Sequence, residues 1–212
     1  MRHAFRALKS RNYRLYFGGQ AVSLIGTWMH IIGQSWLVLR LSNSGFAVGL
    51  VTALQFGPML LAGVWGGLLA DRFPKKKLLI ISQAAYAAEA LLLAVLVATG
   101  LVELWMVYAC SLLAGVISVI DVPARQAFVS EMVGEDDVTS AVSLNGALFN
   151  LSRMAGPAIA GVVIAAISIE ICFFVNAFSF VGVIVALMLM REGELHRTHA
   201  LIKKGSGQIR EG

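Results

Sequence analysis

The chain has 212 residues, of which 58% are hydrophobic and only 14% are charged. A soluble domain cannot bury that much apolar surface, so the composition excludes a soluble globular protein and indicates an integral membrane protein. The net charge of +5 does not indicate nucleic-acid binding, because the basic residues flank apolar segments, where they orient a chain in its membrane.

Six apolar runs follow one another along the chain, and each reaches the roughly 20 residues that a helix needs to cross a bilayer core of about 30 Å. They are approximately Tyr13–Leu41, Phe46–Ala70, Leu78–Ala98, Leu101–Ile120, Thr139–Ile167 and Ile171–Met190. Lipid offers no partner to an unpaired backbone group, so each run is expected to be a helix. The predicted fold is an all-α membrane protein with six transmembrane helices.

The remaining segments are polar. Residues 1–12 are predicted to be a cytoplasmic amphipathic N-terminus lying on the lipid headgroups, and residues 13–190 a six-helix domain. Residues 191–212 are predicted to be a basic cytoplasmic tail that begins an inter-domain linker. Residues 121–137 are too short and polar for a span, so a short interfacial helix followed by an acidic turn is expected there.

Basic residues fall on alternate connections. The N-terminus, the loop after the second run, the loop after the fourth run and the C-terminal tail hold 15 of the 17 lysines and arginines. The positive-inside rule therefore places both termini in the cytoplasm of a cell-membrane protein. Gly57-Pro58 and Gly156-Pro157 interrupt the second and fifth runs at corresponding positions, which is typical of a 3+3 inverted repeat.

A polar stripe follows one face of the first run, at spacings of three and four residues: Gln20, Ser23, Thr27, His30 and Gln34. Beside it lie three glycines seven residues apart, which let another helix approach closely: Gly19, Gly26 and Gly33. The fourth run has a weaker stripe that includes Tyr108 and Ser111. Such groups either bond to neighbouring helices or line a water-filled pathway, and five groups in register favour the pathway.

Three ionisable residues fall inside the runs. Arg153 lies three residues before Gly156, and an unpaired arginine at mid-membrane costs about 2.5–3.5 kcal/mol, so it is expected to face the bundle and have a partner. Its role is either to cap nearby carbonyl groups or to serve the function directly. Glu89 and His30 are candidates for carrying a proton, because an acid in a low dielectric favours its neutral form and a histidine titrates near neutrality. The alternatives are a hydrogen-bonded neutral Glu89 and a neutral, cavity-lining His30.

The loop at residues 67–77, G-L-L-A-D-R-F-P-K-K-K, resembles the signature loop between helices 2 and 3 of the major facilitator superfamily of transporters. Pro74 stands where that pattern prefers glycine. The resemblance implies a cytoplasmic gate, a charge network made by four residues, Asp71, Arg72, Lys75 and Asp121. The alternative is that the lysines only set the topology.

Residues 153–161, R-M-A-G-P-A-I-A-G, resemble the helix-5 motif of proton-driven exporters in this superfamily, with Gly156, Pro157 and Gly161 as the matching positions. Together with F-R-A-L-K-S-R-N-Y-R-L-Y-F-G-G-Q and D-V-P-A-R-Q-A-F, they are similar to the branch of enterobactin exporters and macrolide efflux permeases. Ser111 stands where many members carry an arginine. Members have twelve helices in two halves with the substrate between them, so this chain resembles an N-terminal half.

The expected function is secondary active, proton-driven efflux of a small amphipathic compound, completed by a second six-helix half or by a second copy of this chain. The competing expectation is a non-transporting six-helix membrane protein that regulates or binds another protein, or a truncated remnant. No enzyme motif, ATP-binding loop, metal-ligand set or cofactor site is apparent in the sequence, and the two cysteines, Cys110 and Cys172, are expected to be buried core residues.

Overall fold

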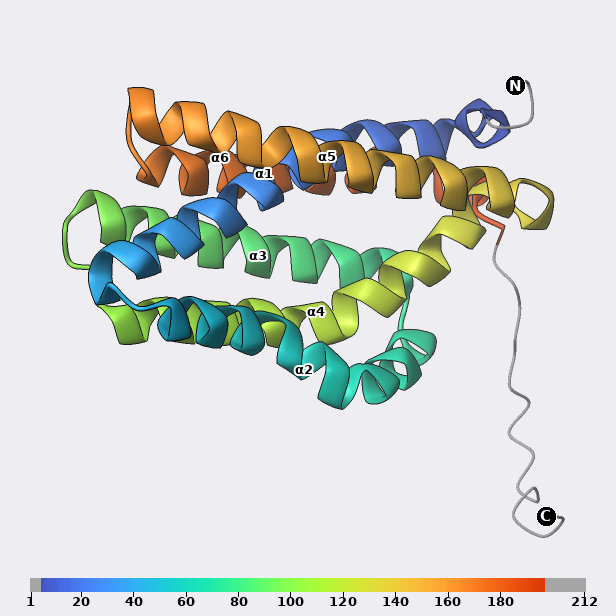
Figure 1. The fold of residues 1–212 in the computed structure, drawn as a ribbon. Coiled ribbons are helices and arrows are strands. Elements are labelled where there is room, and N and C mark those ends of the chain that lie inside the picture. Colours follow the sequence, from blue (N-terminus) through green and yellow to red (C-terminus); the bar gives the residue numbers. More distant parts are fainter. Residues whose placement is uncertain (1–4, 197–212) are drawn as a thin grey trace, which may run out of the picture.

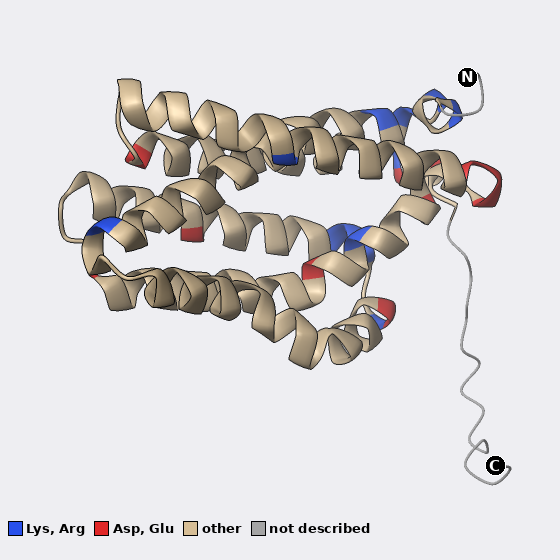
Figure 2. Cartoon of the chain, viewed as in Figure 1, with Lys and Arg blue, Asp and Glu red and all other residues tan. Residues whose placement is uncertain are grey.

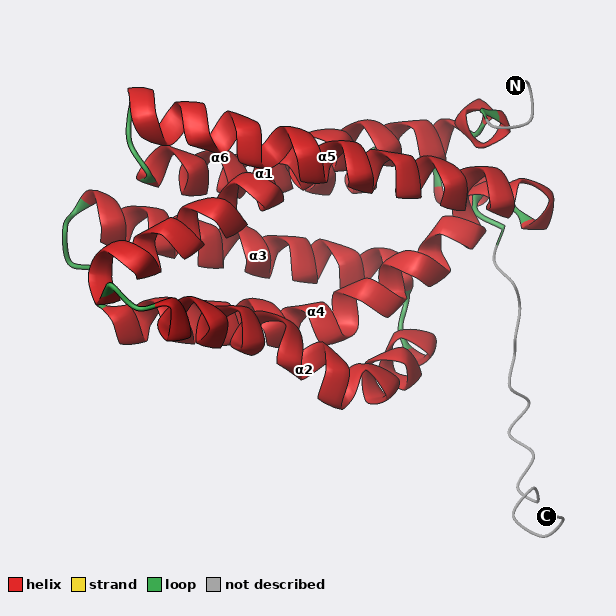
Figure 3. Cartoon of the chain, in the orientation of Figure 1, coloured by secondary structure: helices red, strands yellow, loops and turns green. Residues whose placement is uncertain are grey.

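The computed structural model describes residues 5–196, and this part of the chain is helices joined by short loops, without strands (Figure 3). Its long helices are α1 (Arg11–Ser42), α2 (Gly45–Arg72), α3 (Lys75–Ala98), α4 (Leu104–Val133), α5 (Val138–Ala166) and α6 (Glu170–Met188). Short 3-10 turns lie at η1 (Arg6–Lys9), η2 (Glu135–Asp137) and η3 (Glu192–Glu194). All six long helices are apolar and long enough to cross a membrane, which confirms the six-span prediction.

Successive helices run in opposite directions, so the connections alternate between two ends of the bundle (Figure 1). The start of α1, the α2–α3 and α4–α5 connections and the end of α6 lie at one end, and the other three connections lie at the opposite end. Lysines and arginines gather toward the first end (Figure 2). This arrangement is the one that alternating charge along the sequence predicts for a multi-pass membrane protein.

Helix α4 is longer than predicted. It runs without a break from Leu104 to Val133, so the expected boundary at Ile120 and the separate interfacial helix were wrong. Pro123 lies inside the helix, where a missing N–H is tolerated if neighbouring groups take up the freed carbonyl. Thirty residues at about 1.5 Å per residue extend well beyond a hydrocarbon core of about 30 Å. The positive φ of Gly134, 74°, ends the helix.

The described part of the N-terminal segment packs against protein, which differs from the expected helix lying on the headgroups. After the η1 turn, Ser10 caps α1 by accepting a hydrogen bond from the backbone N–H of Tyr13. The Ala7 N–H donates to Ser140 Oγ at 3.2 Å, and Ser10 Oγ donates to the Met132 carbonyl at 2.8 Å. The segment is therefore fixed to α4 and α5. Residues 1–4 and 197–212 of the predicted tails lie outside the described residues.

The start of α1 is also joined to the end of α6. Asn12 is fully buried, and its side-chain amide donates to the Arg191 carbonyl at 2.9 Å while its oxygen accepts from the Arg191 N–H at 3.0 Å. Arg11 donates to the Leu189 carbonyl at 3.2 Å. These contacts satisfy backbone groups that the end of a helix leaves open. They link parts of the chain that are about 180 positions apart.

Small residues set the helix packing. The row of Gly19, Gly26 and Gly33 lies against α6, which confirms the predicted close approach on this face of α1. Helix α2 packs along α4, where a side chain on Gly66 or Gly115 would meet the backbone of the other helix. Helix α5 packs along α1, and α3 packs against both α4 and α6. Helices α2 and α5 are the least buried of the six.

Candidate functional site

The polar stripe of α1 faces the interior of the bundle. Gln20, Ser23, His30 and Gln34 are each at most 5% exposed, so in this conformation they face neighbouring helices instead of open water. Gln34 Nε2 donates to Ser111 Oγ of α4 at 3.0 Å. Thr27, which is half-buried, donates to the Ser23 carbonyl at 2.9 Å and contacts Asn176 Oδ1 of α6 at 3.4 Å. Sequence reasoning identified this face of α1 but missed Asn176, a polar residue in a mostly apolar helix.

His30 of α1 and Glu89 of α3 form a buried pair near the middle of their helices. His30 Nε2 lies 3.9 Å from Glu89 Oε1, and both side chains are at most 6% exposed. The His30 ring contacts Phe173 of α6 edge to face, with ring centroids 4.9 Å apart. Among the described residues, His30 Nδ1 and Glu89 Oε1 have no hydrogen-bond partner. The structure thus places side by side two residues that the sequence identified separately as candidates for carrying a proton.

Two other titratable groups, Tyr86 and Cys110, lie within the electrostatic influence of Glu89. Tyr86 precedes it on α3 and stacks on Phe180 of α6, with ring centroids 5.4 Å apart. Cys110 is buried on α4, as predicted. The only basic partner within ion-pair distance of Glu89, in residues 5–196, is His30. A net charge on this pair would therefore meet a largely apolar environment.

A second buried cluster surrounds Asp121 of α4. Arg125, one turn further along α4, donates to Asp121 Oδ2 through Nε at 3.1 Å and through its terminal nitrogen. Ser82 and Gln83 of α3 both donate to Asp121 Oδ1, the latter at 2.8 Å. Arg125 also donates to Gln20 of α1. Both carboxylate oxygens therefore accept charge-assisted hydrogen bonds, and three helices meet at the cluster.

The sequence analysis did not identify Arg125 as a partner of Asp121. The signal was present, because an acid and a base four residues apart lie on the same face of a helix. It was not used because residues 121–137 were assigned to a separate interfacial segment. Continuous α4 brings Arg125 back beside Asp121 and next to the polar stripe of α1.

The signature-loop residues are distributed differently from the predicted network. Asp71 and Arg72 are exposed at the end of α2, with no ion pair within the described ranges. Lys75 instead pairs with Glu131 near the end of α4, at 2.9 Å. The structure therefore does not bring Asp71, Lys75 and Asp121 together in this conformation.

Arg153 of α5 is exposed, which corrects the expectation that it faces the bundle interior. Its guanidinium carbon lies 5.8 Å from the ring centroid of Trp28 on α1, so its partner is an aromatic face. The next part of the helix-5 motif is close-packed, because a side chain on Gly156 would collide with Trp28. Pro157 is half-buried inside α5, whereas a side chain on Gly161 would meet open space.

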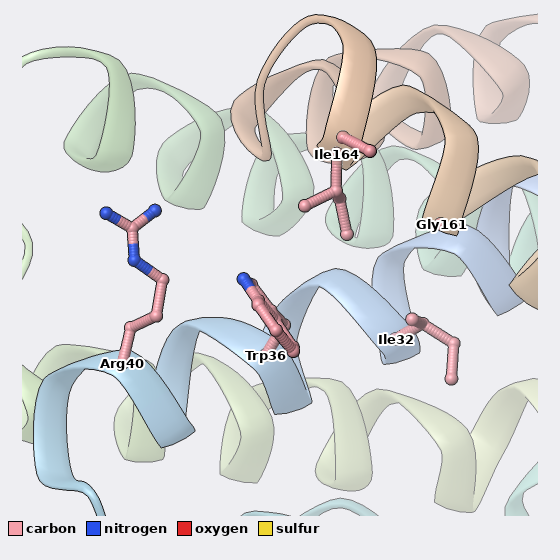
Figure 4. A pocket seen from close by; sticks show the side chains of 6 residues that line it. Ile32, Trp36, Arg40, Gly161 and Ile164 are labelled. Atoms are coloured by element: carbon pink, nitrogen blue, oxygen red, sulfur yellow. The ribbon is translucent and has the colours of Figure 1, made fainter.

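A groove of about 540 Å³ lies between the second halves of α1 and α5 (Figure 4). Its lining is mainly apolar and comes from Ile32, Trp36, Arg40, Gly161, Ile164 and Ala165. Tyr108, the remaining predicted cavity residue, is half-buried and packs beside the apolar cluster that includes Val107 and Leu93. No group of three metal-ligating side chains occurs in the part of the chain that the structure describes.

Comparison of the sequence with known proteins places the chain in a family. Residues 3–204 match the family model described as transmembrane secretion effector. The chain is 29% identical over 178 residues to the staphyloferrin A transporter of Staphylococcus aureus, covering 83% of this chain and 45% of that protein. It is 29% identical over 197 residues to the uncharacterized MFS-type transporter YfiS of Bacillus subtilis, covering 91% of this chain and 46% of the relative.

Efflux proteins are also among the similar sequences. Enterobactin exporter EntS of Shigella flexneri is 23% identical over 153 residues, or 72% of this chain and 37% of that protein. No solved structure matches. The chain spans about half the length of the first two relatives. The family match covers nearly the whole sequence, and the chain therefore belongs to the transmembrane secretion effector family of major facilitator superfamily transporters.

Proposed function

We propose that this chain forms one six-helix half of a proton-driven exporter for a small amphipathic compound. The observation that carries the proposal is the His30–Glu89 pair, which lies 3.9 Å apart and buried between α1 and α3. With one proton the pair has no net charge. Losing that proton or gaining another would leave a charge in a low-dielectric environment, so exchange requires that water reach the site. Such a site can couple protonation to opening of the pathway.

Export is the direction we propose, because the helix-5 motif resembles that of exporters and several relatives are named as efflux proteins. The second half would come from another six-helix segment or a second copy of this chain. We further propose that both termini lie in the cytoplasm, on the side where basic residues gather.

A 3+3 repeat is part of the same proposal. Exchanging α1 with α4, α2 with α5 and α3 with α6 maps the packing of α2 on α4 onto that of α5 on α1. It likewise maps the packing of α3 on α4 onto that of α6 on α1. The repeat would place His30 and Glu89 beside the axis that relates the two triplets, where alternating access in such transporters is controlled.

The first test measures proton binding without knowledge of the substrate. In reconstituted protein, infrared difference spectra between acid and alkaline pH should contain a carboxylic-acid band that Glu89→Gln removes. The second test adds a panel of amphipathic compounds to the medium around inside-out membrane vesicles and imposes a pH gradient. We expect uptake of at least one compound that collapses with the gradient and is lost in Glu89→Gln. Uptake that continues without the gradient would contradict proton coupling.

The competing role, a membrane protein that regulates or binds a partner without transport, is favoured by one observation. The α1 stripe is buried and bonded to neighbouring helices, as a purely structural stripe would be. Replacing Gln20, Thr27 and Gln34 by leucine separates the two roles. If the stripe is only structural, the replacement is harmless or stabilising for folding, and the unaltered protein shows no uptake that could be lost. If it opens to water during transport, uptake is lost while membrane insertion stays normal.

A further inference from the structure

The groove between α1 and α5 has large side chains on one helix and mostly small residues on the other. On α1, four large side chains recur every fourth residue and so share one face: Trp28, Ile32, Trp36 and Arg40. On α5, Arg153, Pro157, Gly161 and Ala165 recur at the same interval. The large residues of one helix therefore oppose mostly small residues of the other. We name the space lined by Ile32, Trp36, Arg40, Gly161, Ile164 and Ala165 the α1–α5 groove.

Small residues on α5 keep the groove open. A side chain built on Gly161 meets no atom within 4 Å, whereas one built on Gly156, five residues earlier, collides with Trp28. Five residues turn a helix by about 140°, so Gly156 and Gly161 face different sides of α5. Helix α5 therefore touches α1 at Gly156, while Gly161 leaves open space beside that contact. Arg40 and Trp36 project from α1 toward the side on which Ile164 of α5 lies (Figure 4). The volume of about 540 Å³ is within the range of about 300–1,000 Å³ typical of small-molecule sites.

The positive charge at the groove is not balanced by acidic residues of α1 or α5. Arg40 lines it and is exposed, and Arg153 lies beside Trp28, one turn before Ile32. Neither α1 nor α5 contains an aspartate or a glutamate. Across residues 5–196, neither arginine has a carboxylate within ion-pair distance. An apolar strip is therefore flanked by two guanidinium groups whose hydrogen-bonding capacity no acidic side chain takes up.

We infer that the α1–α5 groove binds an amphipathic small-molecule anion, and that the exported compound of the proposed function is of this class. The apolar body lies on Ile32, Trp36 and Ile164, and its carboxylate or sulfonate accepts hydrogen bonds from Arg40. A planar guanidinium binds such groups through paired donors. A cationic compound would be repelled by Arg40 and Arg153. The inference rests on the proposed function only where it says that the compound is exported. Binding of the anion in the groove does not depend on that function.

The test uses Trp36, which lines the groove, and Trp28, which precedes Ile32 on the same face of α1. Besides Trp28 and Trp36, the chain contains only Trp65 and Trp105, so Trp65→Phe with Trp105→Phe leaves fluorescence that reports on this region. The protein is placed in nanodiscs of zwitterionic lipid. Three quenchers share one nitronaphthyl body and carry a carboxylate, a carboxamide or an aminomethyl group. We expect the carboxylate to bind about tenfold more tightly than the carboxamide, as one charge-assisted hydrogen bond allows, and the amine to bind most weakly.

Variants locate the binding. Arg40→Gln should remove most of the preference for the carboxylate, while Arg40→Lys should keep part of it. Gly161→Leu should weaken binding of all three quenchers, because it fills space that is empty in the structure. Arg14→Gln is the matched control, since Arg14 is an exposed arginine on the first turns of α1. Size-exclusion profiles identify any variant that fails to fold, and Gly161→Leu provides a test that does not depend on Arg40.

Three outcomes would overturn the inference. Equal quenching by all three probes would remove the anion preference, and unchanged preference in Arg40→Gln would place the anion elsewhere. Loss of carboxylate binding when phosphatidylglycerol is added to the nanodiscs would assign the groove to a lipid headgroup. Because no pH gradient is used, failure of transport leaves the binding result intact. Conversely, proton-driven uptake of compounds without anion preference would show that the exported compound is not of this class, and it would leave both the binding result and the proposed function standing.

Discussion

Asp121 and Glu89 are both acidic residues buried in the bundle, yet their surroundings differ. The oxygens of Asp121 accept hydrogen bonds from Arg125, Ser82 and Gln83, on two helices. The ion-pair neighbour of Glu89 in the described residues is His30, at 3.9 Å, and one oxygen of Glu89 has no hydrogen-bond partner there. A buried carboxylate with full hydrogen bonding is held in place by its partners, whereas one without such partners can change its protonation without breaking hydrogen bonds. The contrast supports a structural role for the first and agrees with the coupling role proposed for the second.

The largest effect on stability is expected from Asp121→Ala. It leaves the half-buried Arg125 without its carboxylate, so we expect a loss of about 3 kcal/mol in the free energy of unfolding, at the lower end of the range for broken buried pairs. Thermal unfolding of the detergent-solubilised protein, followed by fluorescence size-exclusion, measures the loss. Asp136→Asn, an exposed acid in η2, is the control and should unfold like the unaltered protein. Near-normal stability of Asp121→Ala would show that the cluster does not hold the helices together.

A smaller effect is expected from Ser82→Ala, which removes one of the donors to Asp121 while leaving Arg125 and Gln83. A hydrogen bond to a charged group contributes about 1.5–3 kcal/mol, and we expect a loss near the lower figure. Ser130→Ala on α4 is the matched control, because its hydroxyl is exposed and donates to a carbonyl of its own helix. Equal stability of the two variants would argue against a shared cluster.

Removing both charges together tests whether the cluster matters for its charge or for its packing. Asp121→Leu combined with Arg125→Met leaves no unpaired ion, and such replacements are often neutral or stabilising by about 1–4 kcal/mol. We expect the double variant to unfold within about 1 kcal/mol of the unaltered protein, because Gln20, Ser82 and Gln83 lose partners that packing only partly replaces. A double variant as unstable as Asp121→Ala would contradict this explanation.

The smallest effect on stability, within about 0.5 kcal/mol, is expected from Glu89→Gln, since its charge has no hydrogen-bonded partner to lose. The same change should flatten the pH dependence of transport, because glutamine cannot release a proton. Uptake into inside-out vesicles at several pH values measures this, with Glu135→Gln, an exposed acid, as control. A stability loss as large as that of Ser82→Ala, with pH dependence retained, would reverse the assignment of roles.

The sequence predicted the helices well because each span needs a long apolar run, and charges mark where most runs end. It failed at α4 for a physical reason. Asp121 and Arg125 neutralise each other within the helix, so polar residues there do not mark a helix end. It also found His30 and Glu89 without their pairing, because that contact depends on how α1 and α3 pack. Arg153 was misplaced because its partner is an aromatic ring, which charge-pairing rules do not indicate.

The contacts between α1 and α6 have a consequence for synthesis. The first helix enters the membrane before its partner exists, and until then its glycine row faces lipid or the translocation machinery. Asn12 likewise finds the backbone of Arg191 only after the sixth helix has been inserted. Closing a loop of this length is entropically unfavourable and slow relative to local helix formation. Assembly of the bundle therefore finishes at the contact between its first and last helices, and a chain interrupted before α6 exposes a recognisably unfinished first helix.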